Sequence, residues 1–255
     1  NKANATVVVT PYTVTYDGVS HTATVTSITG VNGESGATVG TVDVSGTTHI
    51  LANTYTDTWT FTGAANYNNT SGQVTDVINT KHITGNFTAG NKVYDGNNSA
   101  TVLTRTLNGV VGADAVTLTG GTATFSDKFV ANGKTVTLTG ATLSGADAAN
   151  YVLDSVATTT ANITAKHITG SFTADNKQYD GNNSATVLTR SLSGTISGDV
   201  VSLTGGTATF NDKTVANGKT VTLAGASLIG ADAGNYVLDS VATKVNSTIT
   251  DNVTS

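Results

Sequence analysis

Cysteine and methionine are both absent from the 255-residue sequence, and proline occurs only once. Without cysteine the chain has no disulfide bond, no thiolate metal site and no cysteine nucleophile. Charged residues make up only 11% of the chain, which leaves no runs of Lys and Glu for a coiled coil. The net charge of −5 argues against a nucleic-acid-binding surface. No apolar run approaches the ~20 residues of a membrane-spanning helix.

What remains is rich in Thr, Val, Ala, Asn and Gly, and 38% of the residues are hydrophobic. This content is sufficient for small hydrophobic cores, so we do not expect disorder. The composition favours an all-β protein without catalytic function. Because a complete translation product begins with methionine, we expect the sequence to be a processed product or an internal piece of a longer protein.

A long internal repeat organises the sequence. Residues 81–158 align without a gap to residues 166–243 at an offset of 85, with about 61 of 78 positions identical. The first 80 residues are more distant, but TYDG at residues 15–18 and ANY at residues 65–67 recur in the same order. We therefore predict three domains, at residues 1–80, 81–165 and 166–255. No Pro-rich or Gly/Ser-rich linker separates them, which favours a stiff, elongated array.

Apolar and hydroxylated residues alternate within each repeat, as in TVTLTG at residues 135–140 and TYTDTWTF at residues 54–61. This period of two is typical of half-buried antiparallel strands. Clusters of Gly, Asn and Asp interrupt the strands about every 8–15 residues. About seven or eight short strands per repeat predict tandem Ig-like antiparallel β-sandwiches arranged end to end.

The most distinctive local motif is Tyr-Asp-Gly, at residues 94–96 of the second repeat. Asp-Gly favours a turn because glycine adopts positive φ without a Cβ clash. We expect Tyr94 to pack at the edge of the core, with its hydroxyl near loop backbone. A catalytic or metal-binding role for Asp95 would need a partner carboxylate, and none recurs in all three repeats. The motif therefore indicates a structural turn.

Tyr151, in the sequence ANYVL, begins a late strand. This arrangement resembles a tyrosine corner, in which the phenol bonds back to loop backbone. A plain core tyrosine is the alternative.

The acidic and histidine residues do not form a recognisable active site. Asp147 and Asp154 could ligate Ca²⁺, but the pattern of an EF-hand is missing, and solvated turn residues are the alternative. No histidine pair lies at metal-ligand spacing within one repeat; the histidines are His21, His49, His82 and His167. Neither a GxSxG elbow nor a GxxxxGK[ST] loop occurs. We therefore predict no enzyme activity and assign no catalytic, cofactor-binding or metal-binding residue, with Ca²⁺ as the one candidate cofactor.

Several lysines recur at the same position in the second and third repeats. They are candidates for a covalent Lys–Asn or Lys–Asp crosslink, which needs a buried lysine beside a buried acid. Solvated surface lysines are the alternative. The recurring lysines are Lys81, Lys92, Lys134, Lys166, Lys177 and Lys219.

Two sets of motifs resemble known bacterial repeat families. VTYDGVSHTATVTS at residues 14–27, with ANYN at residues 65–68, is similar to the MBG type of bacterial Ig-like repeat. KxYDG and GADAANY in the second repeat, with their counterparts in the third, resemble the YDG type. The resemblance implies a secreted or surface-anchored bacterial protein similar to filamentous-haemagglutinin-type adhesins. It implies an extracellular location at the bacterial cell surface and no catalytic residues.

Three functions remain open. Close copying of the repeats favours a structural spacer in a surface adhesin or extracellular filament, whose partners are neighbouring repeats of the same long chain. A module that binds a glycan, a surface, a host receptor or a partner protein would need an exposed aromatic platform. Trp59, the single tryptophan, lies instead in a predicted strand and is expected in the core. In the third alternative, residues 3–10 assemble with another molecule by strand exchange, although this segment also fits the first strand of its own domain.

Overall fold

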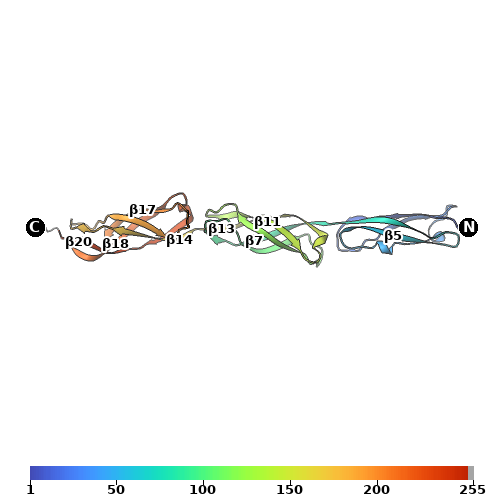
Figure 1. Cartoon of the computed structure of the whole chain (residues 1–255), viewed down its shortest axis with the longest axis horizontal. Coiled ribbons are helices and arrows are strands. Elements are labelled where there is room, and N and C mark those ends of the chain that lie inside the picture. The colour runs from blue at the N-terminus through green and yellow to red at the C-terminus, as the bar shows by residue number, and fades with distance from the viewer. Residues whose placement is uncertain (252–255) are drawn as a thin grey trace. The chain divides into compact units, whose positions relative to one another are not determined.

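The computed structural model describes residues 1–251, and their regular structure consists of strands and short 3-10 turns (Figure 1). The predicted all-β class is confirmed. Among these residues no helix is long and apolar enough to cross a membrane.

Packing divides the chain into two compact units, and each unit includes parts of two successive sequence repeats. The first consists of Asn1–Thr88, Leu103–Thr122 and Leu138–Thr158. The second consists of Ala89–Val102, Ala123–Thr137 and the chain from Thr159 onward. The three domains bounded near residues 80 and 165 stay a prediction, because this division follows packing and does not test independent folding.

The first repeat contains two sheets, with strand orders β1-β3 and β2-β6-β5-β4. Its strands are β1 (Thr6–Thr10), β2 (Thr13–Thr15), β3 (Thr24–Thr29), β4 (Gly40–Asp43), β5 (Asn53–Gly63) and β6 (Thr70–Asn79). Single 3-10 turns cover Gly36–Thr38 and Ser45–Thr47. Strand β1 pairs antiparallel with β3, so most of the segment considered for strand exchange already lies in a sheet of its own repeat.

The second and third repeats share one topology, as their sequence identity predicts. Seven strands of the second are β7 (Lys81–Ala89), β8 (Lys92–Val93), β9 (Val102–Asn108), β10 (Thr117–Phe125), β11 (Ala131–Ser144), β12 (Tyr151–Val156) and β13 (Thr159–Thr164). Seven strands of the third are β14 (Lys166–Ala174), β15 (Lys177–Gln178), β16 (Val187–Ser193), β17 (Ser202–Phe210), β18 (Ala216–Ile229), β19 (Tyr236–Val241) and β20 (Lys244–Thr250). The 3-10 turns Ala148–Asn150 and Ala233–Asn235 directly precede β12 and β19. The two sheets of the second repeat have the strand orders β12-β7-β9 and β10-β11-β13-β8. Those of the third repeat have the strand orders β16-β14-β19 and β15-β20-β18-β17.

These sheets are mixed, which differs from the purely antiparallel pattern expected from the sequence. In the third repeat β14 runs parallel to β19 and β15 runs parallel to β20. The second repeat has the equivalent pairs β7 with β12 and β8 with β13. Side chains alternate between the two faces in either orientation, so a period of two does not reveal the direction of the partner strand.

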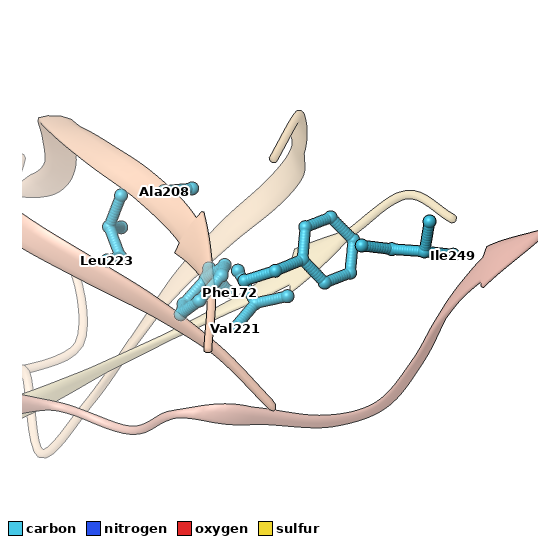
Figure 2. Close-up of a cluster of buried hydrophobic side chains, with 6 residues drawn as sticks. Phe172, Ala208, Val221, Leu223 and Ile249 are labelled. Carbon is cyan, nitrogen blue, oxygen red and sulfur yellow. The ribbon is translucent and has the colours of Figure 1, made fainter. Parts of the chain in front are cut away.

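Alternating apolar residues fill the space between the two sheets of the third repeat (Figure 2). Phe172 extends from β14 in one sheet, while the others come from β17, β18 and β20 in the other. The buried cluster is Phe172, Ala208, Phe210, Val221, Leu223 and Ile249. Burial from both sheets is the packing of a β-sandwich, and it supplies most of the hydrophobic stabilisation of this repeat.

Successive repeats follow one another almost without a break. Strand β6 ends at Asn79 and β7 begins at Lys81, while β13 ends at Thr164 and β14 begins at Lys166. One residue therefore connects the last strand of a repeat to the first strand of the next. This short connection holds the Tyr-Asp-Gly turn of one repeat close to loops of the following repeat.

Candidate functional site

The tyrosine of the first Tyr-Asp-Gly turn is shared between two repeats. Tyr16 directly follows β2, and its backbone N–H donates to the carbonyl of Asn79 (2.9 Å). Its hydroxyl donates to Oδ2 of Asp114 in the second repeat (2.8 Å), and the hydroxyl of Tyr151 donates to the same oxygen (2.6 Å). One carboxylate thus accepts hydrogen bonds from tyrosines of two successive repeats.

Apolar packing supports these hydrogen bonds. The rings of Tyr16 and Tyr151 meet edge to face, with centroids 5.5 Å apart and an interplanar angle of 79°. Both rings belong to one buried cluster with Ile78 from the end of β6 and Ile83 from β7. Edge-to-face pairs of this kind add about 0.5–1.5 kcal/mol beyond the burial of their area.

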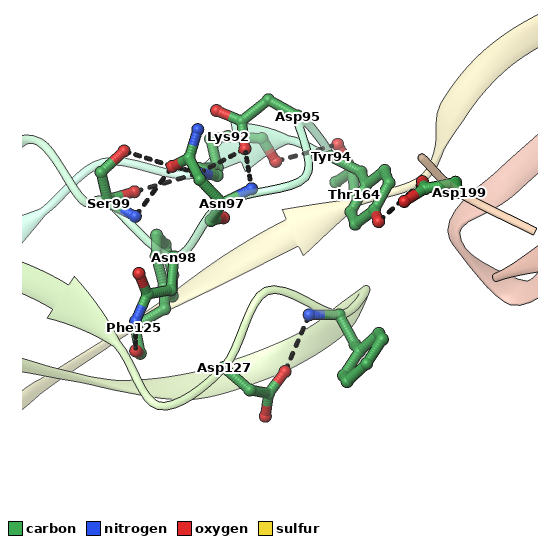
Figure 3. A network of polar contacts seen from close by, with 11 residues as sticks. Lys92, Tyr94, Asp95, Asn97, Asn98, Ser99, Phe125, Asp127, Thr164 and Asp199 are labelled. Atoms are coloured by element: carbon green, nitrogen blue, oxygen red, sulfur yellow. Dashed lines mark hydrogen bonds and ion pairs between the residues drawn. The ribbon is translucent and has the colours of Figure 1, made fainter. Parts of the chain in front are cut away.

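The same arrangement occurs between the second and third repeats. The hydroxyl of Tyr94 donates to Oδ2 of Asp199 (2.8 Å), as Figure 3 shows. The hydroxyl of Tyr236 donates to the same oxygen (2.5 Å). The two rings are again 5.5 Å apart at 79°. In addition, Nζ of Lys128 lies 3.6 Å from Oδ1 of Asp199, whose side chain is 4% exposed. We call each set of two tyrosines and one aspartate a tyrosine junction.

A backbone hydrogen bond to an asparagine side chain accompanies both tyrosine junctions. Asn150, in the 3-10 turn before β12, accepts the N–H of Ala52 at Oδ1 (2.9 Å). Asn235 accepts the N–H of Val130 in the same way (3.1 Å). Both asparagines are buried, at 3% and 4% exposed, so the adjoining repeat satisfies polar atoms that would otherwise be costly to bury.

The glycines of the first and second Tyr-Asp-Gly turns also lie against the next repeat. Gly18 and Gly96 have φ of 79° and 82°, as predicted for the turn. A Cβ at Gly18 would lie 2.9 Å from Cγ1 of Val111, and one at Gly96 would lie 2.9 Å from Cγ2 of Ile196. These glycines therefore permit both the left-handed backbone and the close approach of the neighbouring loop.

The tyrosine junction at Asp199 keeps its two tyrosines protonated and its aspartate ionised. Burial, together with the hydrogen bonds to Asp199, raises the pKa of Tyr94 and of Tyr236 to about 12. Burial disfavours the charged form of Asp199, but hydrogen bonds from Tyr236 and Tyr94 and the charge of Lys128 hold its pKa below the ordinary value. At neutral pH the hydroxyls of Tyr94 and Tyr236 therefore donate to a charged acceptor, which is the stronger type of hydrogen bond.

The hydroxyl of Tyr94 was expected near loop backbone. It reaches a loop, between β16 and β17, but its hydrogen-bond partner there is the side chain of Asp199, 105 residues later in the chain. Of the two interpretations of Tyr151, the hydrogen bond to loop backbone is the one found, because the N–H of Val111 donates to its hydroxyl (2.9 Å). Asp95 has a local role, since Oδ1 accepts the N–H of Asn97 (3.1 Å) and pairs with Nζ of Lys92 (2.7 Å).

The two aspartates considered for Ca²⁺ bind protein groups separately. Asp147 accepts the N–H of Ala115 at Oδ2 (2.8 Å). Asp154 pairs with Nδ1 of His82 (2.5 Å), and Asp239 pairs with His167 in the same way. Within residues 1–251 no cluster of three or more His, Cys, Asp or Glu residues could hold a metal ion.

Two of the recurring lysines are buried and form ion pairs. Nζ of Lys134 lies 2.5 Å from Oδ1 of Asp127, and Lys219 has the same contact with Asp212. The hydrogen bond from Lys134 lowers the pKa of Asp127. The side chains of Asp127 and Asp212 are 47% exposed, so neither pair has the buried acid that a crosslink needs, and both are salt bridges in this geometry.

The remaining histidines and the tryptophan lie in the first repeat. His21 pairs with Asp17 (3.0 Å) and His49 with Asp57 (2.8 Å). Trp59 packs, partly buried, against the core cluster of this repeat. This position agrees with the expected core tryptophan.

Sequence reasoning missed Asp114 and Asp199, although the repeat contains a signal for them. Residues 110–113 and residue 115 all differ from their counterparts at the offset of 85, while the aspartate between them is retained. One fixed acidic residue inside a divergent loop indicates a specific contact, here with the tyrosine of the preceding repeat.

The model of the YDG domain family matches the chain twice, at residues 79–161 and 159–244. The two matches cover the second and third repeats, each of which contains its own Tyr-Asp-Gly turn and Asn-Tyr motif. No curated protein matches the chain in sequence. Because the two matches together cover more than half of its length, the chain belongs to the YDG domain family.

Proposed function

We propose that this chain is a structural spacer, a segment of the stalk of a secreted or surface-anchored bacterial adhesin or extracellular filament. In this proposal its first repeat is of the MBG type, and its partners are neighbouring repeats of the same long polypeptide. The chain acts by setting distance and orientation, without a catalytic step.

The repeated tyrosine junction is the observation that supports this function. A spacer must transmit position from one module to the next, and a flexible linker would lose it. Here a one-residue connection is combined with a buried carboxylate that accepts from tyrosines on both sides. The same device at two successive boundaries favours a modular stalk over a specialised binding domain, which would differ from its flanking repeats.

Small-angle X-ray scattering tests the spacer function. A strand of ~7 residues at ~3.3 Å per residue, with its turns, gives each sandwich roughly 35–40 Å, so three repeats in line extend on the order of 100–120 Å. We expect a maximum dimension in this range, and a broader distribution of interatomic distances after Asp114→Ala and Asp199→Ala together. A maximum dimension near ~60 Å for the unchanged chain, the value for repeats folded back on each other, would contradict the proposal.

A further inference from the structure

Within residues 1–251, the tyrosine of the third Tyr-Asp-Gly turn is much more exposed than the tyrosines of the other two turns. Tyr94 is 1% exposed and Tyr16 is 3% exposed, whereas Tyr179 is 38% exposed. Because the second and third repeats are nearly identical around this turn, the difference in exposure comes from the adjoining repeat and not from the turn itself.

The turn at Tyr179 is nevertheless fully formed. The N–H of Tyr179 donates to the carbonyl of Thr250 (2.9 Å), as that of Tyr94 does to Thr164 (2.8 Å). Asp180 pairs with Nζ of Lys177 (2.7 Å), and Gly181 has φ of 81°. The turn is therefore preorganised for the contact that the other two turns make, and no residue of 1–251 provides that contact.

Two further residues of the third repeat match groups that are used at the junction of the second. Val215 corresponds to Val130, whose N–H is bound by an asparagine of the next repeat, and Val215 is 47% exposed. Lys213 corresponds to Lys128, which pairs with Asp199, and Lys213 is exposed. We call Tyr179, Gly181, Lys213 and Val215 the plug face.

The first repeat carries the complementary half of a tyrosine junction. The hydroxyl of Tyr67 donates to Oε2 of Glu34 (2.9 Å) and accepts the N–H of Val31 (3.2 Å). In the second repeat Tyr151, Asp114 and Val111 make the same three-residue arrangement. Glutamate thus replaces the shared aspartate.

Two residues of the first repeat are exposed, although their counterparts at the tyrosine junctions are buried or partly buried. Val31 is 64% exposed, whereas its counterparts Val111 and Ile196 are partly buried beneath a Tyr-Asp-Gly turn. Asn66 is exposed, whereas the equivalent Asn150 is 3% exposed. We call Val31, Glu34, Asn66 and Tyr67 the socket face.

We propose that the plug face of one molecule docks on the socket face of a second copy of this chain, forming a third tyrosine junction. The hydroxyl of Tyr179 would donate to the Glu34 carboxylate, which already accepts from Tyr67, and Asn66 would accept the N–H of Val215. Lys213 adds a positive charge opposite Glu34, as Lys128 does opposite Asp199. This inference rests on the geometry of the junctions and goes beyond the proposed spacer function, because it assigns a partner to each of two exposed faces.

Docking of this kind is heterologous, because the plug face and the socket face are different surfaces. Every docked pair therefore keeps one unoccupied plug face and one unoccupied socket face. Such contacts continue into open, head-to-tail assemblies unless a rotation closes them into a ring. A single small contact between free molecules is weak. A covalent connection of natural length raises the effective concentration into the millimolar range and makes the contact measurable.

The register of the strands fixes where that connection belongs. Ala3 bridges to Tyr67 in parallel, as Lys81 pairs with Tyr151, and Tyr179 bonds to Thr250 as Tyr94 bonds to Thr164. Joining Thr250 of one copy directly to Lys2 of the next therefore leaves one residue between the two repeats, as at the natural boundaries.

The test compares this fused pair with the single chain by chemical modification of tyrosine, read out by mass spectrometry. We expect modification of Tyr179 in the leading copy to slow about tenfold on fusion. Val31→Asp or Glu34→Ala in the trailing copy should restore the rate of the single chain, while Val19→Asp, also on an exposed valine (55% exposed), should not. An unchanged rate on fusion, or protection that survives both socket variants, would overturn the proposal.

Melting experiments give a second readout that does not depend on modification. Tyr179→Phe should lower the unfolding midpoint of the fused pair and leave that of the single chain unchanged. Equal effects in the two proteins would mean that Tyr179 acts only within its own repeat, and the docking proposal would fail. This result would leave the scattering test of the spacer function unaffected.

Discussion

Gly96 and Gly181 share the same left-handed backbone, with φ of 82° and 81°, but within residues 1–251 only Gly96 of the two lies against another repeat. A Cβ at Gly96 would come within 2.9 Å of Cγ2 of Ile196, whereas a Cβ at Gly181 would meet no described atom within 4 Å. Substitutions at these two glycines therefore distinguish the free-energy cost of backbone strain from the additional cost of steric crowding at a tyrosine junction.

Valine substitutions at these glycines should destabilise the chain to different extents. Gly181→Val should lower the free energy of unfolding by about 1–2 kcal/mol, because a β-branched residue is strained at positive φ. Gly96→Val should cost more, because it also pushes against Ile196. Urea unfolding followed by circular dichroism measures both. Equal losses would indicate that the turn does not press against the next repeat.

Alkaline pH should weaken the chain through its junction tyrosines. Burial raises the pKa of Tyr94, Tyr151 and Tyr236 from 10.0 to about 12. A raised acid pKa means that the unfolded state loses its protons first, so the stabilisation is complete below pH 10 and is lost as pH rises through about 12. Thermal melting between pH 8 and pH 12, with Tyr236→Phe as a comparison, should show a smaller alkaline loss in the variant.

Acidic pH tests the ion pair at the second junction. The pKa of Asp199 lies below its ordinary value of 3.8, so its contribution is present above that pH and is lost as pH falls through the lowered pKa. Lys128→Met removes one favourable charge, and we expect acid unfolding to begin at higher pH, with a loss of less than about 1 kcal/mol at neutral pH. Lys213→Met, at the equivalent exposed position, should change neither quantity.

Removal of divalent cations should not change the stability of the chain. Asp147 and Asp154, the candidate Ca²⁺ ligands, hydrogen-bond to Ala115 and His82 respectively. Because their oxygens serve separate protein contacts, we expect the same melting temperature with a chelator and with added Ca²⁺. An increase with Ca²⁺ that Asp147→Asn abolishes would disprove this.

The sequence predicts the elements of the site better than it predicts their assembly. Local physics determines the turn at Gly96 and the bond between Tyr151 and the Val111 loop, so both followed from short motifs. The contact between Tyr94 and Asp199 joins different repeats, and no local pattern encodes a partner 105 residues away. The parallel strand pairs were missed for a related reason, since alternation gives the buried face of a strand and not its neighbour.

The double-mutant cycle of Tyr94→Phe and Asp199→Ala tests the central claim, that a shared carboxylate couples successive repeats. We expect a coupling energy of about 1–3 kcal/mol in urea unfolding, the range for a buried hydrogen bond to a charged group. In a control cycle, the effects of Tyr179→Phe and Asp199→Ala should be additive within about 0.5 kcal/mol. Tyr179 is the counterpart of Tyr94 in the third Tyr-Asp-Gly turn, and that turn does not contact the Asp199 carboxylate. Additive effects in both cycles would contradict the claim and leave the tyrosine junction without a role in joining the repeats.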